Sequence, residues 1–271
     1  MLTEILANKY EEVRRKKEEL PLRILENQLE FSPVPRDFIS ALSIENKVNV
    51  IAEIKKASPS HGKFNSSFLH RFSTSEIARY YQENGASAVS VLTDLNYFAG
   101  SLEYLKEAKR VTEIPVLRKD FIVDEYQLFE SRVTGADAIL LIVSCLSQER
   151  LESLLELARD LKMSALVEVG TLEEIDRAVQ AGAEIIGINN RDLNTLQVDL
   201  SRTLKLAKLI PSGIVKVSES GINDFEQVKQ LREEAGISAV LVGNSLVNAT
   251  NPGEKIKELA ISQNRGGYCQ Q

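Results

Sequence analysis

Short apolar runs rich in β-branched residues recur along the chain after residue 47, and longer segments with helical periodicity separate them. The apolar runs cover 48–54, 88–92, 115–117, 138–143, 165–169, 185–188, 214–217 and 239–242. The helical segments include 75–84, 102–111, 148–161, 172–181 and 224–235. Such an alternation predicts repeated βα units and therefore a parallel sheet.

The number and spacing of these units indicate how the sheet is arranged. The eight apolar runs begin about 27 residues apart on average, close to the roughly 30 residues per unit of a (β/α)8 barrel. The alternative is an open, doubly wound sheet, but no glycine-rich dinucleotide motif follows the first run. We therefore predict the α/β class, with a single closed (β/α)8 or TIM barrel.

Glycine marks the predicted change from helix to strand in four of these units. Gly85, Gly135, Gly182 and Gly236 each follow a helical segment and precede an apolar run. Glycine tolerates the left-handed backbone in which many helices end, so these positions support the predicted boundaries.

The first 47 residues lie outside this repeat and predict an N-terminal helical extension that packs on the barrel. Residues 2–20 have the pattern of a charged amphipathic helix that ends at Pro21, and 36–42 predict a second helix. We divide the chain into the extension, 1–47, the barrel, 48–262, and a polar C-terminal tail, 263–271.

All eight predicted strands follow the extension, so a barrel could close without it. We therefore hypothesise that the extension folds over the mouth of the barrel and shields a substrate from water. The apolar residues that could form this cover are Ile5, Phe31, Pro33, Val34 and Phe38. The alternative is a plug at the barrel bottom that protects only the core.

The composition is that of a globular protein with a large core, and it narrows the kinds of partner. Hydrophobic residues make up 43% and charged residues 27% of the 271-residue chain. A net charge of −6 disfavours nucleic acid as a partner, so an anionic substrate needs locally placed basic or N–H groups. The basic run Arg14–Lys17 stands between acidic residues, which is typical of a solvated helix face.

The chain has few residues that could bind a metal or form disulfides. The chain has two cysteines, Cys145 and Cys269, and two histidines, His61 and His70. No stretch approaches the roughly 18 uninterrupted apolar residues of a membrane span, and the first residues lack the apolar core of a secretory signal. We expect a cytoplasmic protein without metal, organic cofactor or membrane contact, as a monomer or weak homodimer.

Polar and reactive residues follow nearly every predicted strand. They include Glu53, Lys55, Thr93, Asp94, Lys119, Asp120, Glu168, Asn189, Arg191, Glu219, Ser220, Gly221, Gly243 and Asn244. Barrel enzymes build their active sites at the carboxyl ends of the strands. We therefore expect an active site at this end.

The alternation of side chains along a strand indicates which of these groups converge. Residues two apart share a face, so Glu53 and Lys55 point the same way, as does Lys119 after the apolar Leu117. Glu168 and Asn189 follow the same rule on their strands. Lysines and carboxylates in one mouth can donate and accept protons. The alternative is a buried ion-pair network with a structural role only.

The last two strands end in short glycine motifs. Gly221 and Gly243, with Asn244, follow the seventh and eighth apolar runs, where barrels often bind phosphate through backbone N–H groups. The phase of the seventh strand stays open, because either Glu219 or Ser220 could face the pocket.

These motifs together resemble those of a known family. Residues 51–60, Ile-Ala-Glu-Ile-Lys-Lys-Ala-Ser-Pro-Ser, closely resemble the first-strand signature of the indole-3-glycerol phosphate synthases. The segments similar to its later strand-end motifs are 117–122 (Leu-Arg-Lys-Asp-Phe-Ile), 166–169 (Leu-Val-Glu-Val), 186–193 (Ile-Gly-Ile-Asn-Asn-Arg-Asp-Leu) and 218–222 (Ser-Glu-Ser-Gly-Ile). Order and spacing agree over roughly residues 1–260.

The resemblance implies a reaction and a set of catalytic residues. The family converts 1-(2-carboxyphenylamino)-1-deoxyribulose 5-phosphate to indole-3-glycerol phosphate, carbon dioxide and water in tryptophan biosynthesis, and is a carbon–carbon carboxy-lyase. Lys119 would be the general acid in ring closure, and Glu168 the acid/base group in dehydration. Lys55 would pair with the substrate carboxylate, with Glu53 orienting it. Asn189 and Ser220 would complete the catalytic set.

The resemblance also implies the binding residues. Ser58, Gly221, Gly243 and Asn244 would contact the phosphate, and Arg191 would hold substrate and pocket loop. Phe98, Phe121 and Leu193 would form the walls for the aromatic ring. The chain departs from the usual family pattern at His61, Gly170 and Asn244, positions expected at the rim of the pocket.

Two rival functions remain at this point. Another phosphate-binding barrel, such as a phosphoribosylanthranilate isomerase, would use a Cys/Asp pair at its strand ends for catalysis. Cys145 follows the wrong strand for that role. A non-catalytic barrel should have lost some of the reactive residues at its strand ends, yet Glu53, Lys55 and Lys119 are all present.

Overall fold

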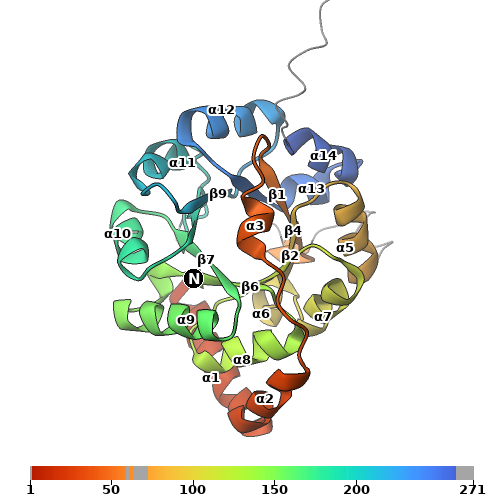
Figure 1. The fold of residues 1–271 in the computed structure, drawn as a ribbon, viewed down its shortest axis with the longest axis vertical. Coiled ribbons are helices and arrows are strands. Elements are labelled where there is room, and N and C mark those ends of the chain that lie inside the picture. The colour runs from red at the N-terminus through yellow and green to blue at the C-terminus, as the bar shows by residue number, and fades with distance from the viewer. Residues whose placement is uncertain (1, 59–61, 64–72, 194, 261–271) are drawn as a thin grey trace, which may run out of the picture.

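The computed structural model describes residues 2–58, 62–63, 73–193 and 195–260, and the side chains of Ser58 and Lys63 are not part of the description. Within them eight parallel strands form one closed barrel (Figure 1). The strands are β1 (Asn49–Ile54), β4 (Ala88–Leu92), β5 (Val116–Lys119), β6 (Ala138–Ile142), β7 (Ser164–Val169), β8 (Ile185–Asn189), β9 (Val215–Glu219) and β10 (Ala239–Val242). The ring closes because β1 pairs with both β4 and β10. The predicted fold class is confirmed.

Several strands extend further toward their carboxyl ends than the apolar runs predicted. Lys119 pairs with Leu92 at the end of β5, and Asn189 pairs with Glu219 across β8 and β9. The reactive residues are therefore held by the sheet itself rather than by the loops that follow. Strand pairing fixes their direction, which is the rigidity that a functional site needs.

Helices surround the barrel and cover its outer face (Figure 1). They are α5 (Thr74–Glu83), α7 (Leu102–Val111), α8 (Glu125–Thr134), α9 (Gln148–Asp160), α10 (Leu172–Gln180), α11 (Ser201–Leu206), α12 (Phe225–Ala235) and α14 (Pro252–Leu259). Shorter elements are α6 (Leu95–Phe98), α13 (Asn244–Asn248), the 3-10 turns η2 (Val143–Cys145) and η3 (Ala207–Leu209), and the antiparallel pair β2 (Ala57–Ser58) and β3 (Gly62–Lys63). The five predicted helices agree with α5, α7, α9, α10 and α12 to within one residue at each end.

Two apolar layers follow from the alternation of side chains along the strands. The residues that face inward fill the barrel, among them Ile51, Leu117 and Leu166. Their neighbours in the sequence, such as Val50 and Val167, pack outward against the helices. Strands buried on both faces are expected in a parallel barrel, which explains why they are nearly continuous apolar runs.

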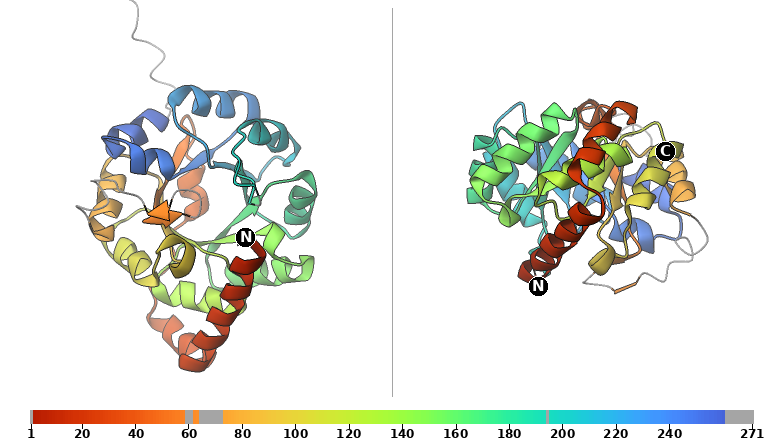
Figure 2. Two further views of the ribbon diagram at one scale, coloured as in Figure 1. Left: turned by 180° about the vertical axis from the view of Figure 1, so that it is seen from behind. Right: turned by 90° about the horizontal axis from the view of Figure 1, so that it is seen from below.

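The N-terminal extension reaches both ends of the barrel. Its elements are α1 (Leu2–Glu19), α2 (Leu22–Gln28), η1 (Leu29–Phe31) and α3 (Phe38–Leu42). Figure 1 shows α3 over the centre of the strand ring, and in Figure 2 the first turn of α1 lies at the opposite opening. Asn49, the first residue of β1, donates from its Nδ2 to the carbonyl of Leu42 at 2.8 Å, which places α3 at the amino-terminal end of the strands, the bottom.

The structure places Ile5, one of the residues expected to cover the mouth, at the mouth, and it contradicts this placement for others; that the extension shields a substrate stays a prediction. Ile5 of α1 is buried and faces the mouth. Phe31 and Val34 are 84% and 79% exposed, so they cover nothing. Phe38 is buried among the inward residues at the bottom, where it plugs the barrel. The hypothesis failed here because apolar character alone does not show which end of a barrel a residue reaches.

The polar tail expected at 263–271 lies outside the described residues. Within those residues, no helix is both long and apolar enough to cross a membrane.

We predict that Phe38→Ala lowers the free energy of unfolding without weakening substrate binding. Removing a fully buried phenyl group leaves a cavity and costs about 3–5 kcal/mol, measured by urea unfolding. Because Phe38 lies at the bottom, KM should not change. The exposed Phe31→Ala is the matched control and should stay within about 0.5 kcal/mol of the parent. A strong rise of KM in Phe38→Ala would contradict the placement.

Candidate active site

A cavity of about 670 Å³ opens at the carboxyl ends of the strands, the mouth of the barrel. It has the size of a small-molecule site. Of the site residues predicted from sequence, those that line it are Glu53, Lys55, Phe98, Lys119, Phe121, Glu168, Asn189, Arg191, Leu193, Ser220, Gly221, Gly243 and Asn244. Ser58 ends β2, and its side chain lies outside the description.

Lys119 lies at the centre of the polar part of the cavity. Its Nζ is 3.0 Å from Oε2 of Glu219 and 3.5 Å from Oε2 of Glu168. Burial lowers the pKa of Lys119, but Glu219, Glu168 and Glu53 outweigh this effect, so the pKa is raised. Lys119 is therefore an ammonium group at neutral pH and can donate a proton.

Glu168 is oriented by a neighbour on the next strand. Asn189 donates from its Nδ2 to Oε1 of Glu168 at 2.9 Å, while Oε2 faces Lys119. The Oδ1 atom of Asn189 accepts the backbone N–H of Arg191 at 3.0 Å. Asn189 thus fixes both the carboxylate of Glu168 and the start of the loop after β8.

Glu219 is the candidate site residue whose orientation the sequence left undecided. Val217 faces the barrel interior, so Glu219, two residues later, also points inward and is 1% exposed. Ser220 lines the cavity as well, because the chain turns there with a positive φ of 67°. Both candidates therefore reach the site, and only the pairing of β9 shows that Glu219 is the partner of Lys119.

The environment of Glu219 gives it a proton near neutral pH. Burial raises its pKa most strongly, Lys119 opposes this, and Glu168 and Glu53 raise it further, to about 7. Its Oε1 makes no hydrogen bond within the described residues. Burial and neighbouring carboxylates both disfavour the charged form of a carboxyl group, which explains the direction of this shift.

Glu53 and Lys55 form the second ion pair of the site. Their side chains meet at 2.8 Å between Oε1 and Nζ. Burial raises the pKa of Glu53, but Lys55, Lys119 and Arg191 outweigh burial and lower it, so Glu53 is a carboxylate. Glu53 can therefore hold the Lys55 ammonium in place while that ammonium faces a ligand.

Two glycines make room for these carboxylates. A Cβ on Gly187 would lie 2.1 Å from Oε1 of Glu219, and a Cβ on Gly243 would lie 2.2 Å from Oε1 of Glu53. Both distances are far below van der Waals contact. Glycine is thus required at these positions by the packing of the acids.

The cavity lining also includes aromatic side chains. The Phe98 and Phe121 rings have centroids 6.3 Å apart and are tilted by 40°, which is within the range of favourable aromatic pairs. Leu193 of the loop after β8, with Leu2 and Ile5 of α1, completes the apolar lining. A planar ring would bury its surface here.

A third region, at the ends of β9 and β10, has unpaired polar atoms. Gly221 and Gly243 line the cavity here, with Asn244 and Ser245 at the start of α13. The buried Oδ1 of Asn244 and Oγ of Ser245 make no hydrogen bond within the described residues. Most buried polar atoms in proteins are hydrogen-bonded, so these two atoms are candidates for contact with a ligand. Ser245 was not predicted from sequence, although it directly follows Asn244.

Comparisons with known proteins agree over nearly the whole chain. The family model "Indole-3-glycerol phosphate synthase" matches residues 2–259. A protein with that name from Desulforamulus reducens is 44% identical over 267 residues, covering 98% of this chain and 99% of its own. Another from Legionella pneumophila (strain Paris) is 44% identical, covering 96% and 98%. The chain belongs to the indole-3-glycerol phosphate synthase family.

Solved structures outside this family share its fold at low identity. A thiamine phosphate pyrophosphorylase from Pyrococcus furiosus has a TM-score of 0.58 at 17% identity, covering 78% of this chain and 93% of that one. A phosphoribosylanthranilate isomerase from Thermotoga maritima has a TM-score of 0.53 at 15% identity, covering 78% and 96%. These likenesses show the barrel fold alone.

The three departures from the usual pattern of the synthase family lie in different places. Asn244 lines the cavity. Gly170 follows β7 outside the cavity lining, where its N–H donates to Glu174 at 2.6 Å. His61 lies outside the described residues. Of the two departures that the structure describes, Asn244 alone is positioned to meet a ligand of a synthase.

The loop after β8 of this family member is held by arginines. Arg191 donates from Nη1 to the carbonyl of Leu196 at 2.9 Å, and Arg202 donates to the carbonyl of Asn189 at 3.0 Å. The structure thus places Arg191 on the loop that carries Leu193, as the family resemblance implied. Its contact with a substrate stays a prediction.

We predict that Glu219→Gln changes how the stability of this synthase-family protein depends on pH. Glu219 deprotonates near its ordinary value of 4.5 in the unfolded chain and at about 7 in the fold. The folded state therefore binds the extra proton between these values, and its stability falls as pH rises through them. Glutamine cannot titrate, so the variant should gain stability relative to the parent from about pH 5 to about pH 8.

The measurement is the free energy of unfolding of both proteins across that pH range. Glu226→Gln on α12, an exposed position, controls for the loss of one carboxylate. A constant difference between Glu219→Gln and the parent at every pH would show that Glu219 has an ordinary pKa.

Proposed function

We propose that the chain catalyses the reaction of its family, the conversion of 1-(2-carboxyphenylamino)-1-deoxyribulose 5-phosphate to indole-3-glycerol phosphate, carbon dioxide and water. It would thus be a carbon–carbon carboxy-lyase of tryptophan biosynthesis. The single observation that carries the proposal is the cavity that brings together the Lys119 ammonium, held by Glu219 and Glu168, an aromatic pair and a glycine-rich polar region. These three regions match the ring, the reacting carbons and the phosphate of this substrate.

The substrate would lie across the mouth. Its carboxyphenyl ring would pack on Phe98 and Phe121, whose faces border the apolar side. Its phosphate would accept hydrogen bonds from backbone N–H groups near Gly221 and Gly243 and from Ser245. Glycine lets the backbone approach an anion closely, which supports this end for the phosphate.

Ring closure needs a carbonyl made more electrophilic by a proton donor. The ring carbon that bears the carboxylate attacks the ketone carbon, and the carbonyl oxygen takes a proton as the new carbon–carbon bond forms. Lys119 is the best placed donor, because its raised pKa keeps it protonated and the carboxylates fix its position. A positioned acid of this kind contributes about 10²–10⁴-fold to a rate.

Decarboxylation then restores the aromatic ring. The bond between the ring carbon and the carboxylate breaks, carbon dioxide leaves, and the electron pair returns to the ring system. Lys55 would pair with that carboxylate before it leaves, and Glu53, 2.8 Å from Lys55, would orient the ammonium.

Dehydration completes the indole ring. The hydroxyl group made in the first step leaves as water when an acid protonates it, and a base removes the proton from the neighbouring carbon. Glu168 would serve as this acid/base group, with Asn189 fixing its orientation through the 2.9 Å hydrogen bond. Glu219, with its pKa near 7, would accept or return a proton through Lys119.

The same proposal extends to the state of the protein in the cell. We propose a cytoplasmic enzyme that acts as a monomer or weak homodimer, without metal or organic cofactor, and in which 1–47, 48–262 and 263–271 are extension, barrel and tail. The large exposed apolar side chains of the described residues, such as Tyr10, Leu95 and Leu209, belong to different elements. Scattered exposed apolar groups are ordinary on a monomer surface. Sedimentation equilibrium tests the proposed oligomeric state.

We predict that Lys119→Ala loses at least about 10²-fold in kcat while the barrel stays folded. The reason is the loss of the proton donor for ring closure. The assay incubates pure protein with the carboxyphenylamino-deoxyribulose phosphate and follows indole fluorescence. The exposed Lys106→Ala on α7 is the matched control. A parent protein without signal would refute the proposed function, and a Lys119 variant with more than about a tenth of parental kcat would assign the proton to another group.

We predict that Ser245→Ala weakens the binding of phosphate. The buried Oγ of Ser245 has no hydrogen-bond partner among the described residues, and a hydrogen bond to a charged group contributes about 1.5–3 kcal/mol. Inorganic phosphate should compete with substrate in the parent, and its inhibition constant should rise about 10-fold or more in the variant. Ser153→Ala, on the exposed side of α9, is the control. Equal inhibition constants for all three proteins would exclude this end of the cavity as the phosphate site.

A further inference from the structure

Lys9 of the N-terminal helix is a buried lysine that meets three carboxylates. Its Nζ lies 2.8 Å from Glu12, 2.9 Å from Asp94 and 2.9 Å from Asp120, and the residue is 1% exposed. Lys9 donates a hydrogen bond to Glu12 and forms ion pairs with the two aspartates. Burying a charge is unfavourable unless it is paired, so these three carboxylates are what allows Lys9 to be buried.

The two aspartates belong to loops that carry the aromatic side of the cavity. Asp94 caps α6, where its Oδ1 accepts the N–H of Tyr97 at 2.8 Å, and α6 ends with Phe98. Asp120 follows Lys119 directly, and its Oδ1 accepts the N–H of Phe121 at 2.8 Å. The two carboxylates therefore hold the backbone on either side of the Phe98–Phe121 pair.

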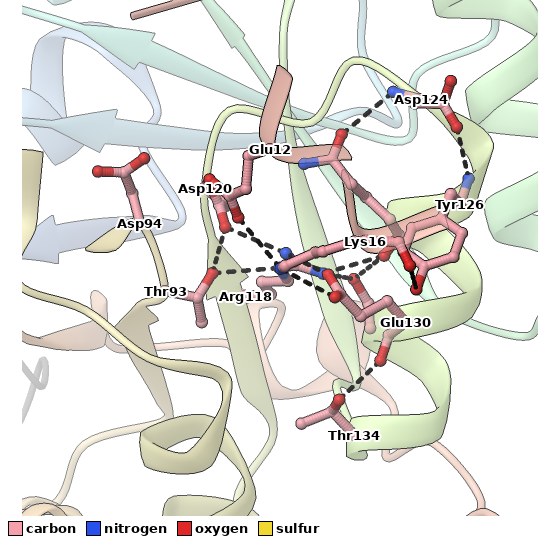
Figure 3. A network of polar contacts seen from close by, with 12 residues as sticks. Glu12, Lys16, Thr93, Asp94, Arg118, Asp120, Asp124, Tyr126, Glu130 and Thr134 are labelled. Carbon is pink, nitrogen blue, oxygen red and sulfur yellow. Dashed lines mark hydrogen bonds and ion pairs between the residues drawn. The ribbon is translucent and has the colours of Figure 1, made fainter. Parts of the chain in front are cut away.

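Asp120 is also held by a second buried network, which does not include Lys9. Figure 3 shows Asp120 with Thr93 and Arg118, at 2.6 Å and 3.1 Å from its Oδ2. Arg118 continues to Glu130 of α8 at 2.9 Å. The loop after β5 is thus tied to the barrel wall whether or not Lys9 is present.

The carboxylate of Asp94 has fewer partners among the described residues. In Figure 3 its carboxylate makes no contact with the network around Arg118. Its Oδ2 is buried, makes no hydrogen bond within the described residues, and has the ammonium of Lys9 at 2.9 Å. Thr93 already bonds the start of the loop carrying Phe98 to Asp120, and Lys9 adds a second link, from Asp94 at the start of α6 to Asp120 after the end of β5.

The helix that supplies this lysine also reaches the cavity. Leu2 and Ile5 line it, and Lys9 is one helical turn beyond Ile5, on the same face. Asn8 donates to the hydroxyl of Tyr97, which fixes α1 to α6 at a second point. The position of α1 against the barrel therefore affects the shape of the cavity.

We propose that Lys9 is a positioning residue for the reaction, which bridges Asp94 and Asp120 and so sets the spacing of the aromatic walls and the place of Lys119 beside them. This inference rests on the proposed function for its effect on turnover. A shift of about 1 Å in a catalytic group can cost about 10²-fold in rate. Loss of the bridge should therefore impair both ring binding and proton donation.

The test is the double variant Lys9→Met/Asp94→Asn. Methionine fills a similar volume, and asparagine keeps the cap of α6 while it removes the carboxylate that would be left unpaired. Asp120 keeps Arg118 as its counter-ion. Glu12 loses its contact with Lys9 as well, but it keeps Lys16 at 3.1 Å. The variant should therefore fold, with its melting temperature close to that of the parent, and without the bridge.

We expect kcat/KM of the double variant to fall about 10- to 100-fold, with a rise in KM as part of the loss. A purely structural role would lower the fraction of folded enzyme and hence the apparent kcat, but it would leave KM unchanged. The matched control is Lys16→Met, because Lys16 also ties α1 to the barrel, 2.9 Å from Glu130, away from the cavity. This control should keep kcat and KM within about twofold of the parent.

A binding measurement separates this inference from the proposed function. Anthranilate, which has the carboxyphenylamino group alone, is titrated calorimetrically into the parent and both variants. Weaker binding to the double variant only, together with the raised KM, supports the bridge. Parental KM and parental anthranilate affinity in the double variant, or an equal loss in Lys16→Met, would overturn it. A parent that binds anthranilate but forms no indole product would instead refute the proposed function.

Discussion

Closure of the strand ring is the constraint on which the remaining structure depends. Because β1 pairs with both β4 and β10, each strand has one face inside the barrel and one under the helices. Inward residues such as Ile51 and Leu117 fill the interior, and the next inward residues on those strands, Glu53 and Lys119, must then point into the mouth. The reactive groups are therefore placed by backbone pairing, which is rigid, rather than by loops.

The charges that closure brings together are balanced against each other. Lys119 faces Glu219 and Glu168, and Lys55 faces Glu53, at distances from 2.8 to 3.5 Å. A buried carboxylate without a cation would be costly, so these pairs allow the acids to lie inside the barrel. Burial raises the pKa of Glu219 most strongly, and Glu168 and Glu53 raise it further, to about 7, although Lys119 opposes this. Glu219 is therefore a group that can exchange a proton near neutral pH.

The extension connects the two ends of the barrel. Its helix α3 closes the bottom through Phe38, and α1 contributes Ile5 to the mouth. Lys9 then joins α1 to the loops that carry Phe98 and Lys119 through two buried aspartates. The extension thus adds to the core at one end and to the site at the other. Because the extension reaches both ends of the barrel, the prediction that all of its apolar residues cover the mouth was wrong.

The sequence alone determined the eight βα units and most of the cavity, because strand periodicity already places Lys119 and Glu168 on inward faces. It could not decide between Glu219 and Ser220, since the polar residues after Val217 show no apolar alternation and only the pairing of β9 with its neighbours sets their phase. Likewise, no local pattern reveals that Lys9 meets Asp94 and Asp120. Those contacts join segments far apart in the chain, and they exist because closure of the barrel and docking of α1 bring the segments together.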